Sequence, residues 1–439
     1  MTLNDILDFY YIDTIDRSTT AVGMEIELPI VPIGGGIVSA EFAAEITAFL
    51  SSLGFIPQQF TRDGYACELQ DKTGDSISFE TSWNTIEFSI KFRQDLFSLL
   101  QTYKRILIPL QNFCMEKGYY LCGRGINPNY PDLDPSPLNT EVLQAKSEFL
   151  AKYTNHHDGE IFHALCASVQ THLDAVDKAS YLKLFRLLRR AYVFEALLFA
   201  NSLPVDISFT ERHPALKSLK RDTLCYRDEL WKFCGAPNVI LSDDPLETVD
   251  DFRNYLRAKE LFVIKQHYKI VPIPATPMTD YCKDPDWQPE TLSCFRSLEP
   301  VAPTKHGTLE IRSTCVQPLD AMLQPAAFYT GLSVAVDEAA RHVDEIYRKH
   351  FPGLSPVQVR DALMQASNAP LRKELKEDVE TLLNISRMGL QQRGLGEEKL
   401  LTPLTERLAK NNWQVPAQCL QEDPLTQTKE EMNRLEGRN

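Results

Sequence analysis

Apolar and polar residues alternate with a period of two in four short segments that lie far apart in the chain. These segments are 20–30, 84–90, 167–175 and 307–314. Such alternation is typical of a strand with one buried face, so each segment is a predicted strand. Carboxylates dominate the polar faces, together with an amide, a histidine and an arginine: Glu25, Glu27, Glu87, Gln170, His172, Asp174, Glu310 and Arg312.

Carboxylates that gather on one face repel one another unless divalent cations lie among them. Glu25 and Glu27 are two residues apart, which separates their Cα atoms by roughly 6.5–7 Å on one strand face. That spacing suits two magnesium ions, or one ion held by both carboxylates, although a solvent-facing strand edge shows the same pattern. Glu80 and Glu87 form a second acidic pair that could point into the same cavity. The polar faces therefore predict a site for a magnesium nucleotide.

An arginine and one histidine extend this prediction, whereas a second histidine does not. Arg312 shares its predicted strand face with Glu310, and a guanidinium can donate two parallel hydrogen bonds to a phosphate; a structural ion pair is the alternative. His172 is either a metal ligand or a core histidine. His163 belongs to the segment NHHDGEIFH, whose spacing fits no zinc site, and is predicted to lie at the surface. Because the chain has no GxxxxGK[ST] or GxGxxG motif, metal and arginine would hold the nucleotide.

Helical periodicity fills most of the chain between the predicted strands. Helices are expected at 1–18, 40–54, 92–117, 140–165, 177–200, 246–265 and from 318 onward, with loops at 121–137, 203–245 and 270–306. Gly54 is expected to end the second helix. Strands that interleave irregularly with helices favour an α+β fold with an antiparallel sheet. We expect one catalytic domain over 1–439, of which 318–439 is a mainly helical C-terminal portion.

The composition is that of an ordinary globular protein, with 43% hydrophobic and 24% charged residues among 439. A net charge of −14 without a long basic run argues against a nucleic-acid partner. The longest apolar stretch, 191–200, is about half a membrane span and contains Glu195, and the N-terminus lacks a signal-peptide pattern. Ten cysteines without CxxC spacing argue against zinc and a disulfide scaffold. A cytoplasmic protein with reduced thiols and no membrane partner is expected.

Eight segments, in order, resemble the glutamate–cysteine ligase family, most closely its plant-like branch. They are GMEIE, ETSWNTIE, GRGINP, VQTHLD, ALLFANSLP, TLEIRS, QPAAFYTGL and LQQRGLGEEKLLTPL. Two departures stand out: ETSWN replaces a Glu-Pro-Gly-Gly-Gln segment, and His172 replaces an asparagine. The spacing of Glu80 and Glu87 is similar to that of the enterobacterial branch.

This resemblance implies a glutamine-synthetase-like fold, a curved antiparallel sheet with flanking helices whose polar face binds ATP and two or three Mg²⁺ ions. It implies an ATP-dependent ligase that joins glutamate and cysteine through an acyl phosphate. The implied metal ligands are Glu25, Glu27, Glu80, Glu87, Gln170 and Glu310. Arg312 would contact the transferring phosphoryl group and, with Gln170, the nucleotide. The implied substrate-binding residues are Arg221, His172 and Asn201, with Arg212 and Arg227 as alternatives to Arg221.

Three other functions remain open on the sequence. The first is a diverged ligase of secondary metabolism that joins another amino acid to another amine, since the substrate region matches the family only loosely. The second is a small-molecule phosphotransferase of the guanidino-kinase type, which would need more arginines around the nucleotide. The third is a catalytically inactive binding protein. In each case the expected partners are small molecules, amino-acid substrates for the ligase, and the protein is expected to be a monomer or homodimer.

Overall fold

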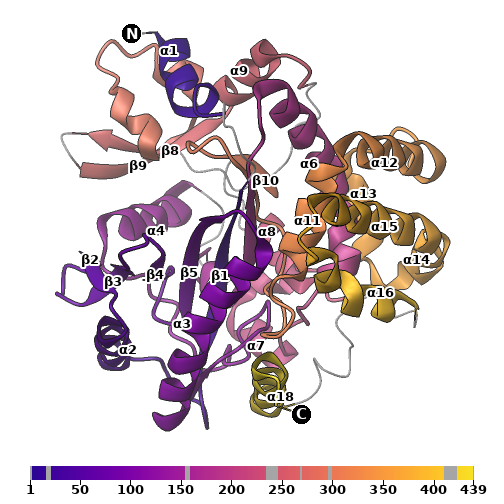
Figure 1. Ribbon diagram of the computed structural model, residues 1–439. Helices are drawn as coiled ribbons and strands as arrows, with labels where there is room; N and C mark the ends of the chain where they lie inside the picture. The colour runs from indigo at the N-terminus through magenta and orange to yellow at the C-terminus, as the bar shows by residue number, and fades with distance from the viewer. Residues whose placement is uncertain are drawn as a thin grey trace.

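The computed structural model describes residues 2–15, 21–153, 159–233, 246–266, 269–294, 299–409 and 423–438. Within these residues, nine antiparallel strands form one sheet in the order β10-β11-β7-β1-β5-β4-β3-β2, and β6 pairs with the end of β1 (Figure 1). The strands are β1 (Val22–Pro32), β2 (Ile56–Phe60), β3 (Ala66–Gln70), β4 (Ser76–Phe79), β5 (Thr85–Arg93), β6 (Tyr119–Leu121), β7 (Val169–Leu173), β10 (Val301–Pro303) and β11 (Leu309–Ile311). A separate hairpin pairs β8 (Glu260–Gln266) with β9 (Lys269–Pro277).

The apolar face of strand β1 anchors the hydrophobic core. Met24, Ile26 and Leu28 are almost completely buried, and they share one cluster with side chains of helices α3 (Leu96–Glu116) and α11 (Gln324–Val334). Helix α3 contacts β1 and β5, while α11 contacts β1 and β7. Helices therefore cover the apolar face, and the acidic residues of β1 are left on the opposite face. The predicted α+β class, with a helix-flanked antiparallel sheet, is confirmed.

Capping residues in the sequence mark the start and the end of helix α2 (Ala40–Ser52). Ser39 caps α2 by accepting a hydrogen bond from the backbone N–H of Phe42 at 3.2 Å, and Gly54 follows the helix with a φ of 94°. A positive φ suits glycine because it has no Cβ. The helix predicted over 177–200 is α6 (Lys178–Phe199). No helix among the described residues is both long enough and apolar enough to span a bilayer.

The remaining helices are shorter, and two predicted helices are divided. The segment 1–18 contains α1 (Leu3–Leu7) and a π-helical turn to Ile12, while 16–20 lie outside the described residues. The segment 140–165 contains α4 and α5, and residues 154–158 between them also lie outside the description. The shorter helices before β11 are α4 (Glu141–Tyr153), α5 (Gly159–Leu165), α7 (Ile207–Arg212), α8 (Tyr226–Phe233), α9 (Val249–Arg257) and α10 (Met278–Tyr281).

Two element predictions between residues 246 and 306 are wrong. The predicted helix 246–265 ends at Arg257, where α9 gives way to β8. The sequence of β8, ELFVIKQ, is rich in the aromatic and β-branched residues that favour strands. The predicted loop 270–306 contains β9, whose prolines are tolerated because each strand of a two-stranded sheet has a free edge, and it also contains β10. Strand β6 was not predicted, because its sequence YYL shows no alternation of apolar and polar residues.

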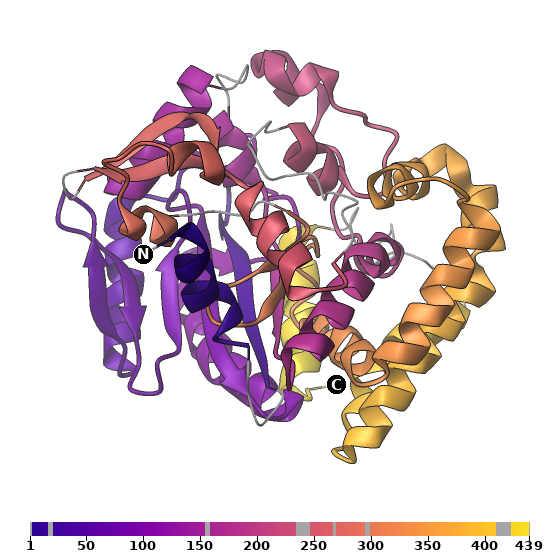
Figure 2. The ribbon, with the colours of Figure 1, turned by 90° about the horizontal axis from the view of Figure 1, so that it is seen from above.

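After β11, all of the secondary-structure elements in the described residues are helices. The α-helices among them are α11, α12 (Val336–His350), α13 (Pro356–Met364), α14 (Ala369–Glu374), α15 (Lys376–Arg393), α16 (Thr402–Ala409) and α18 (Pro424–Glu436). Figure 2 shows α12 and α15 running side by side at the edge of the molecule, and α11 packs against α15. Whether this portion folds with the rest as one domain stays a prediction.

Helices α11 and α15 approach each other closely at two glycines, Gly331 and Gly389, and we therefore expect a substitution there to change stability. A Cβ on Gly389 would overlap the carbonyl oxygen of Gly331, and a Cβ on Gly331 would overlap the backbone of Ser386. Gly389→Ala is therefore expected to lower the free energy of unfolding by about 1–3 kcal/mol through overpacking. Urea denaturation measures this, and an alanine variant as stable as the wild type would contradict the tight packing, because alanine normally favours a helix over glycine.

Candidate active site

Register within the sheet places the acids of β1 and β5 on the same face. Glu27 lies opposite Glu87, and Glu25 lies opposite Ser89. Residues that pair directly across two strands share a face of the sheet. On β1 the apolar neighbour Ile26 is buried on the other face, so the alternation that defines the core also assembles the acids.

Strands β7 and β11 add their polar residues to the same face. Gln170 of β7 lies opposite Glu25, and His172 of β7 lies opposite Glu310 of β11. Arg312 follows Glu310 by two residues and therefore continues this face beyond the end of β11. The polar residues thus form a band across β11, β7, β1 and β5.

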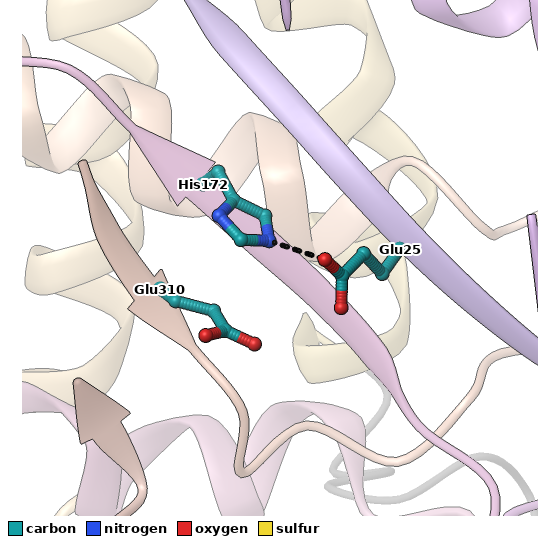
Figure 3. Close-up of side chains that lie close together, drawn as sticks. All are labelled: Glu25, His172 and Glu310. Atoms are coloured by element: carbon teal, nitrogen blue, oxygen red, sulfur yellow. Dashed lines mark ion pairs between the residues drawn. The ribbon is translucent and has the colours of Figure 1, made fainter. Parts of the chain in front are cut away.

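One group in this band, here called the histidine cluster, consists of Glu25, His172 and Glu310. One ligand atom from each lies within 4.8 Å of the others, and the three side chains point toward one another (Figure 3). The Nε2 atom of His172 lies 3.2 Å from Oε1 of Glu25. Burial disfavours the charged form of His172, but the Glu25 carboxylate outweighs it and raises the pKa of the imidazole. For Glu25, attraction to His172 outweighs burial and lowers the pKa.

A second group, here called the carboxylate cluster, consists of Glu27, Glu80 and Glu87. One oxygen from each lies within 4.8 Å of the others. Burial, followed by repulsion from Glu80, raises the pKa of Glu27 to about 7. The same two causes hold the pKa of Glu87 well above its usual range. Near neutral pH Glu27 and Glu87 therefore keep part of their protons, which a bound divalent cation would displace.

Gln170 supplies a neutral oxygen beside the carboxylate cluster. Its Nε2 donates to Oε1 of Glu27 at 2.9 Å and to Oγ of Ser168 at 3.2 Å. Its Oε1 is buried and accepts no hydrogen bond from any described residue. Carboxylate and amide oxygens are the ligands that Mg²⁺ and other hard cations prefer, so the donor set fits the implied metal.

The side chain of Arg312 is attracted by carboxylates of both clusters. It forms an ion pair with Glu310. Burial opposes its charge, but the surrounding acids, beginning with Glu310 and Glu25 and including Glu27, outweigh burial and raise its pKa. A permanent cation therefore lies where the acids of both clusters act on it.

Two cavities lie over this face of the sheet. The larger, of about 310 Å³, is lined by Glu25 and His172 of the histidine cluster and by residues of β5, including Lys91 and Phe92. The smaller, of about 70 Å³, is lined by Glu27 and Glu80 of the carboxylate cluster. The other residues that line the smaller cavity are Thr81, Lys146, His163, Cys166, Ser168, Gln170, Arg227, Trp231 and Arg312.

Two of the three substrate residues implied by the sequence lie apart from these cavities. Arg221 is exposed, and its guanidinium donates to the carbonyl oxygen of Val205 at 2.6 Å. Asn201 is completely buried, and its amide donates to the carbonyl oxygens of Gly123 and Val316. Neither lines the larger or the smaller cavity. The third, His172, lies between two carboxylates of the histidine cluster.

Of the two alternatives to Arg221, Arg227 lines the smaller cavity and Arg212 does not. Arg227 is 3% exposed, and its guanidinium donates to the carbonyl oxygens of Ser313 at 2.8 Å and Arg312 at 3.1 Å. The segment 203–245 was predicted as irregular, so helix α8, which carries Arg227 and Trp231, was missed. The spacing of four residues that places both side chains on one side of this helix was the available signal.

His163 and Lys146 also line the smaller cavity, and the sequence analysis assigned neither to the site. The prediction that His163 lies at the surface is wrong. Helix α5 turns this side chain inward, where its ring packs edge-to-face on Trp231 with the centroids 5.9 Å apart. The sequence held no signal for Lys146, because its helix reaches the cavity only through the tertiary fold.

The comparisons with known proteins come from sequence and structure. Among solved structures, the chain is similar to a bifunctional glutathione synthetase from Pasteurella multocida, with 12% identity and a TM-score of 0.43, over 98% of this chain and 54% of that one. It is also similar to a glutamate–cysteine ligase from Francisella tularensis in complex with AMP, with 10% identity and a TM-score of 0.41, over 96% and 94% of the two chains. The chain thus spans about half the length of the Pasteurella protein. No curated protein matches it in sequence.

A family comparison covers the part of the chain that contains β1, β5 and β7. Residues 21–204 match glutamate–cysteine ligase family 2 (GCS2). This range includes both clusters except Glu310. This match shows that residues 21–204 are similar to the glutamate–cysteine ligase family, and the rest of the chain lies outside the match.

Proposed function

We propose that this protein is an ATP-dependent carboxylate–amine ligase that forms an amide through an acyl phosphate. The observation that supports this best is the pair of clusters on one sheet face with Arg312 between them. Such a face can hold cations, phosphates and a reacting carboxylate together. The family match over residues 21–204 supports the same reaction class.

The histidine and carboxylate clusters, with Gln170, would hold two or three Mg²⁺ ions. Bound there, the ions would neutralise phosphate charge and align the phosphoryl group with its acceptor. The donor chemistry supports this assignment, because five carboxylates lie on one face with the amide oxygen of Gln170, which has no hydrogen-bond partner among the described residues.

ATP would occupy the larger cavity. Its volume of about 310 Å³ is at the lower end of the range of about 300–1,000 Å³ that small-molecule pockets have. Phe92, which is 62% exposed and lines this cavity, would stack on the base, and Lys91 would supply a cation. The histidine cluster would then face the phosphates, with Arg312 beyond it.

The acid substrate would enter the smaller cavity and meet the nucleotide at Arg312. A carboxylate oxygen forms a bond to the γ-phosphorus while the bond from that phosphorus to the bridging oxygen breaks, which releases ADP. The amine nitrogen then bonds to the acyl carbon, the bond from that carbon to the phosphate oxygen breaks, and the nitrogen releases one proton. Arg312 would stabilise the charge that develops during both transfers.

Glutamate and cysteine are the substrates we propose first, with the product γ-glutamylcysteine. A different acid and amine remain the alternative, because Trp231, His163 and Lys146 give the smaller cavity a lining that the family motifs do not describe. A kinase-type phosphotransferase is less well supported, since two of the described arginines, Arg227 and Arg312, line that cavity. Free buried cysteines among the described residues fit a reducing, cytoplasmic setting.

The first prediction concerns the reaction itself. ADP and phosphate release should require ATP, Mg²⁺, an acid and an amine together, measured with amino acids supplied singly and in pairs. Glu27→Gln, which removes one acid of the carboxylate cluster, serves as the inactive control. ADP without free phosphate would indicate a phosphotransferase instead, and no release under any combination would leave a binding protein.

The second prediction concerns Arg312. Replacing it with lysine or alanine should lower turnover at saturating ATP by about 10²–10³-fold, because a donor to the transferring phosphoryl group is lost. Arg434→Lys, which alters an exposed arginine paired with Asp320, is the matched control. Near wild-type turnover by a folded Arg312 variant would remove this residue from the reaction.

The third prediction links Mg²⁺ binding to protons. Because the pKa values of Glu27 and Glu87 are raised, binding Mg²⁺ should expel protons at pH 7, and the affinity should be higher at pH 8 than at pH 6. Calorimetry in buffers of different ionisation enthalpy measures the released protons. A binding heat that does not depend on the buffer would mean that the cation does not bind to the carboxylate cluster.

The fourth prediction identifies the arginine that holds the α-carboxylate of the acid. Arg212, Arg221 and Arg227 are the candidates, and the cavity lining favours Arg227. Arg227→Lys should raise the KM for the acid about tenfold or more and change the KM for ATP little, because bidentate contact is lost. Arg221→Lys is the matched comparison. Should Arg221→Lys show the larger effect, the carboxylate would lie nearer helix α7 than the smaller cavity.

A further inference from the structure

His163 presents an unused polar atom to the smaller cavity. Its Nε2 is buried and makes no hydrogen bond with any described residue. Leaving a buried donor or acceptor without a partner is energetically unfavourable. Because the ring lines a cavity, the missing partner can be an atom of a bound ligand.

The imidazole ring of His163 packs against Trp231, which in turn contacts Arg227. It meets the indole of Trp231 edge-to-face, at an angle of 83° between the ring planes. The guanidinium of Arg227 lies over the same indole, 5.6 Å from the ring centroid. The imidazole ring, which belongs to α5 and packs on Trp231 of α8, presents its nitrogen in one direction. A specific ligand contact requires such a fixed orientation.

The surroundings of His163 keep the ring neutral. Burial first, and then the positive charges of Lys146 and Arg312, hold the pKa of His163 well below its usual range. A neutral imidazole carries a proton on one nitrogen and a lone pair on the other, so one nitrogen accepts a hydrogen bond.

The other charged groups around the cavity indicate which part of a ligand His163 would bind. Lys146, Arg227 and Arg312 are donors without acceptor capacity. Glu27 and Glu80 are assigned to a cation in the proposed function. A ligand in this cavity that carries an N–H group therefore finds in His163 a neutral acceptor that no cation claims.

We propose that Nε2 of His163 accepts a hydrogen bond from a substrate amino group in the smaller cavity. The group is either the α-amino group of the acid or the attacking amine. Accepting an N–H hydrogen from a neutral amine would leave its lone pair free to face the acyl carbon. His163 would thus be a specificity-determining residue, and this inference rests on the proposed function.

Binding measurements with two substitutions test the role. His163→Phe keeps a ring against Trp231 but removes the acceptor, whereas His163→Gln keeps an amide oxygen near the position of Nε2. Thermal shift with each of the twenty amino acids, in the presence of Mg²⁺ and a non-hydrolysable ATP analogue, first identifies those that the wild type binds. Calorimetry then gives their Kd for each variant, and His342→Gln on α12 is the matched histidine control.

His163→Phe should weaken binding of at least one amino acid about tenfold without changing the Kd of the nucleotide, and His163→Gln should restore most of that loss. Whether the affected amino acid serves as the acid or the amine follows from the activity assay. Unchanged amino-acid binding by His163→Phe, or equal losses in the Phe and Gln variants, would overturn the role of His163 alone. A wild type that binds nucleotide but no amino acid would overturn the proposed function, and the role of His163 with it.

Discussion

Repulsion among buried carboxylates is the constraint on which the organisation of this protein depends. Glu27, Glu80 and Glu87 lie close enough that burial and mutual repulsion raise the pKa of Glu27 to about 7. A protein that needed this sheet only as a scaffold would gain stability from polar neutral residues here. Groups whose pKa values are shifted this far by burial and a specific neighbour cluster at functional sites.

The apolar face of the sheet keeps these acids together. A slip of one residue in the pairing of β1 with β5 would exchange Glu27 for Ile26 and place charge in the core. The completely buried Ile26 thus fixes the register, and the register fixes which acids meet. Core packing and site geometry are therefore two consequences of the same alternation.

This alternation explains which parts of the structure the sequence could predict. Each polar-faced strand was found from its own residues, because a period of two is a local property. The pairing of His172 with Glu310 could not be found in that way, because it depends on which strands become neighbours. The presence of His163 and Trp231 in the site could not be predicted either, because helices α5 and α8 meet only through tertiary packing. Strand β9 was missed because its prolines resemble those of a loop, and β8 was missed because it follows directly on helix α9.

The smaller cavity depends on residues beyond the segment that matches the family. Arg227 and Trp231 come from α8, and Arg312 follows β11. Helix α8 is held by a buried ion pair in which Arg360 of α13 donates to both carboxylate oxygens of Asp228, at 2.5 and 2.7 Å.

Arg360 also lies 3.3 Å from Glu195 of α6, which accepts a hydrogen bond from Thr314, two residues beyond Arg312. Breaking a buried pair of this kind typically costs about 3–5 kcal/mol because the remaining charge is left without compensation. The network therefore couples the C-terminal helices to the two arginines of the cavity. The strands and their ends supply the acids and Arg312, while helix α8 supplies Arg227 and the indole of Trp231 that a substrate would meet.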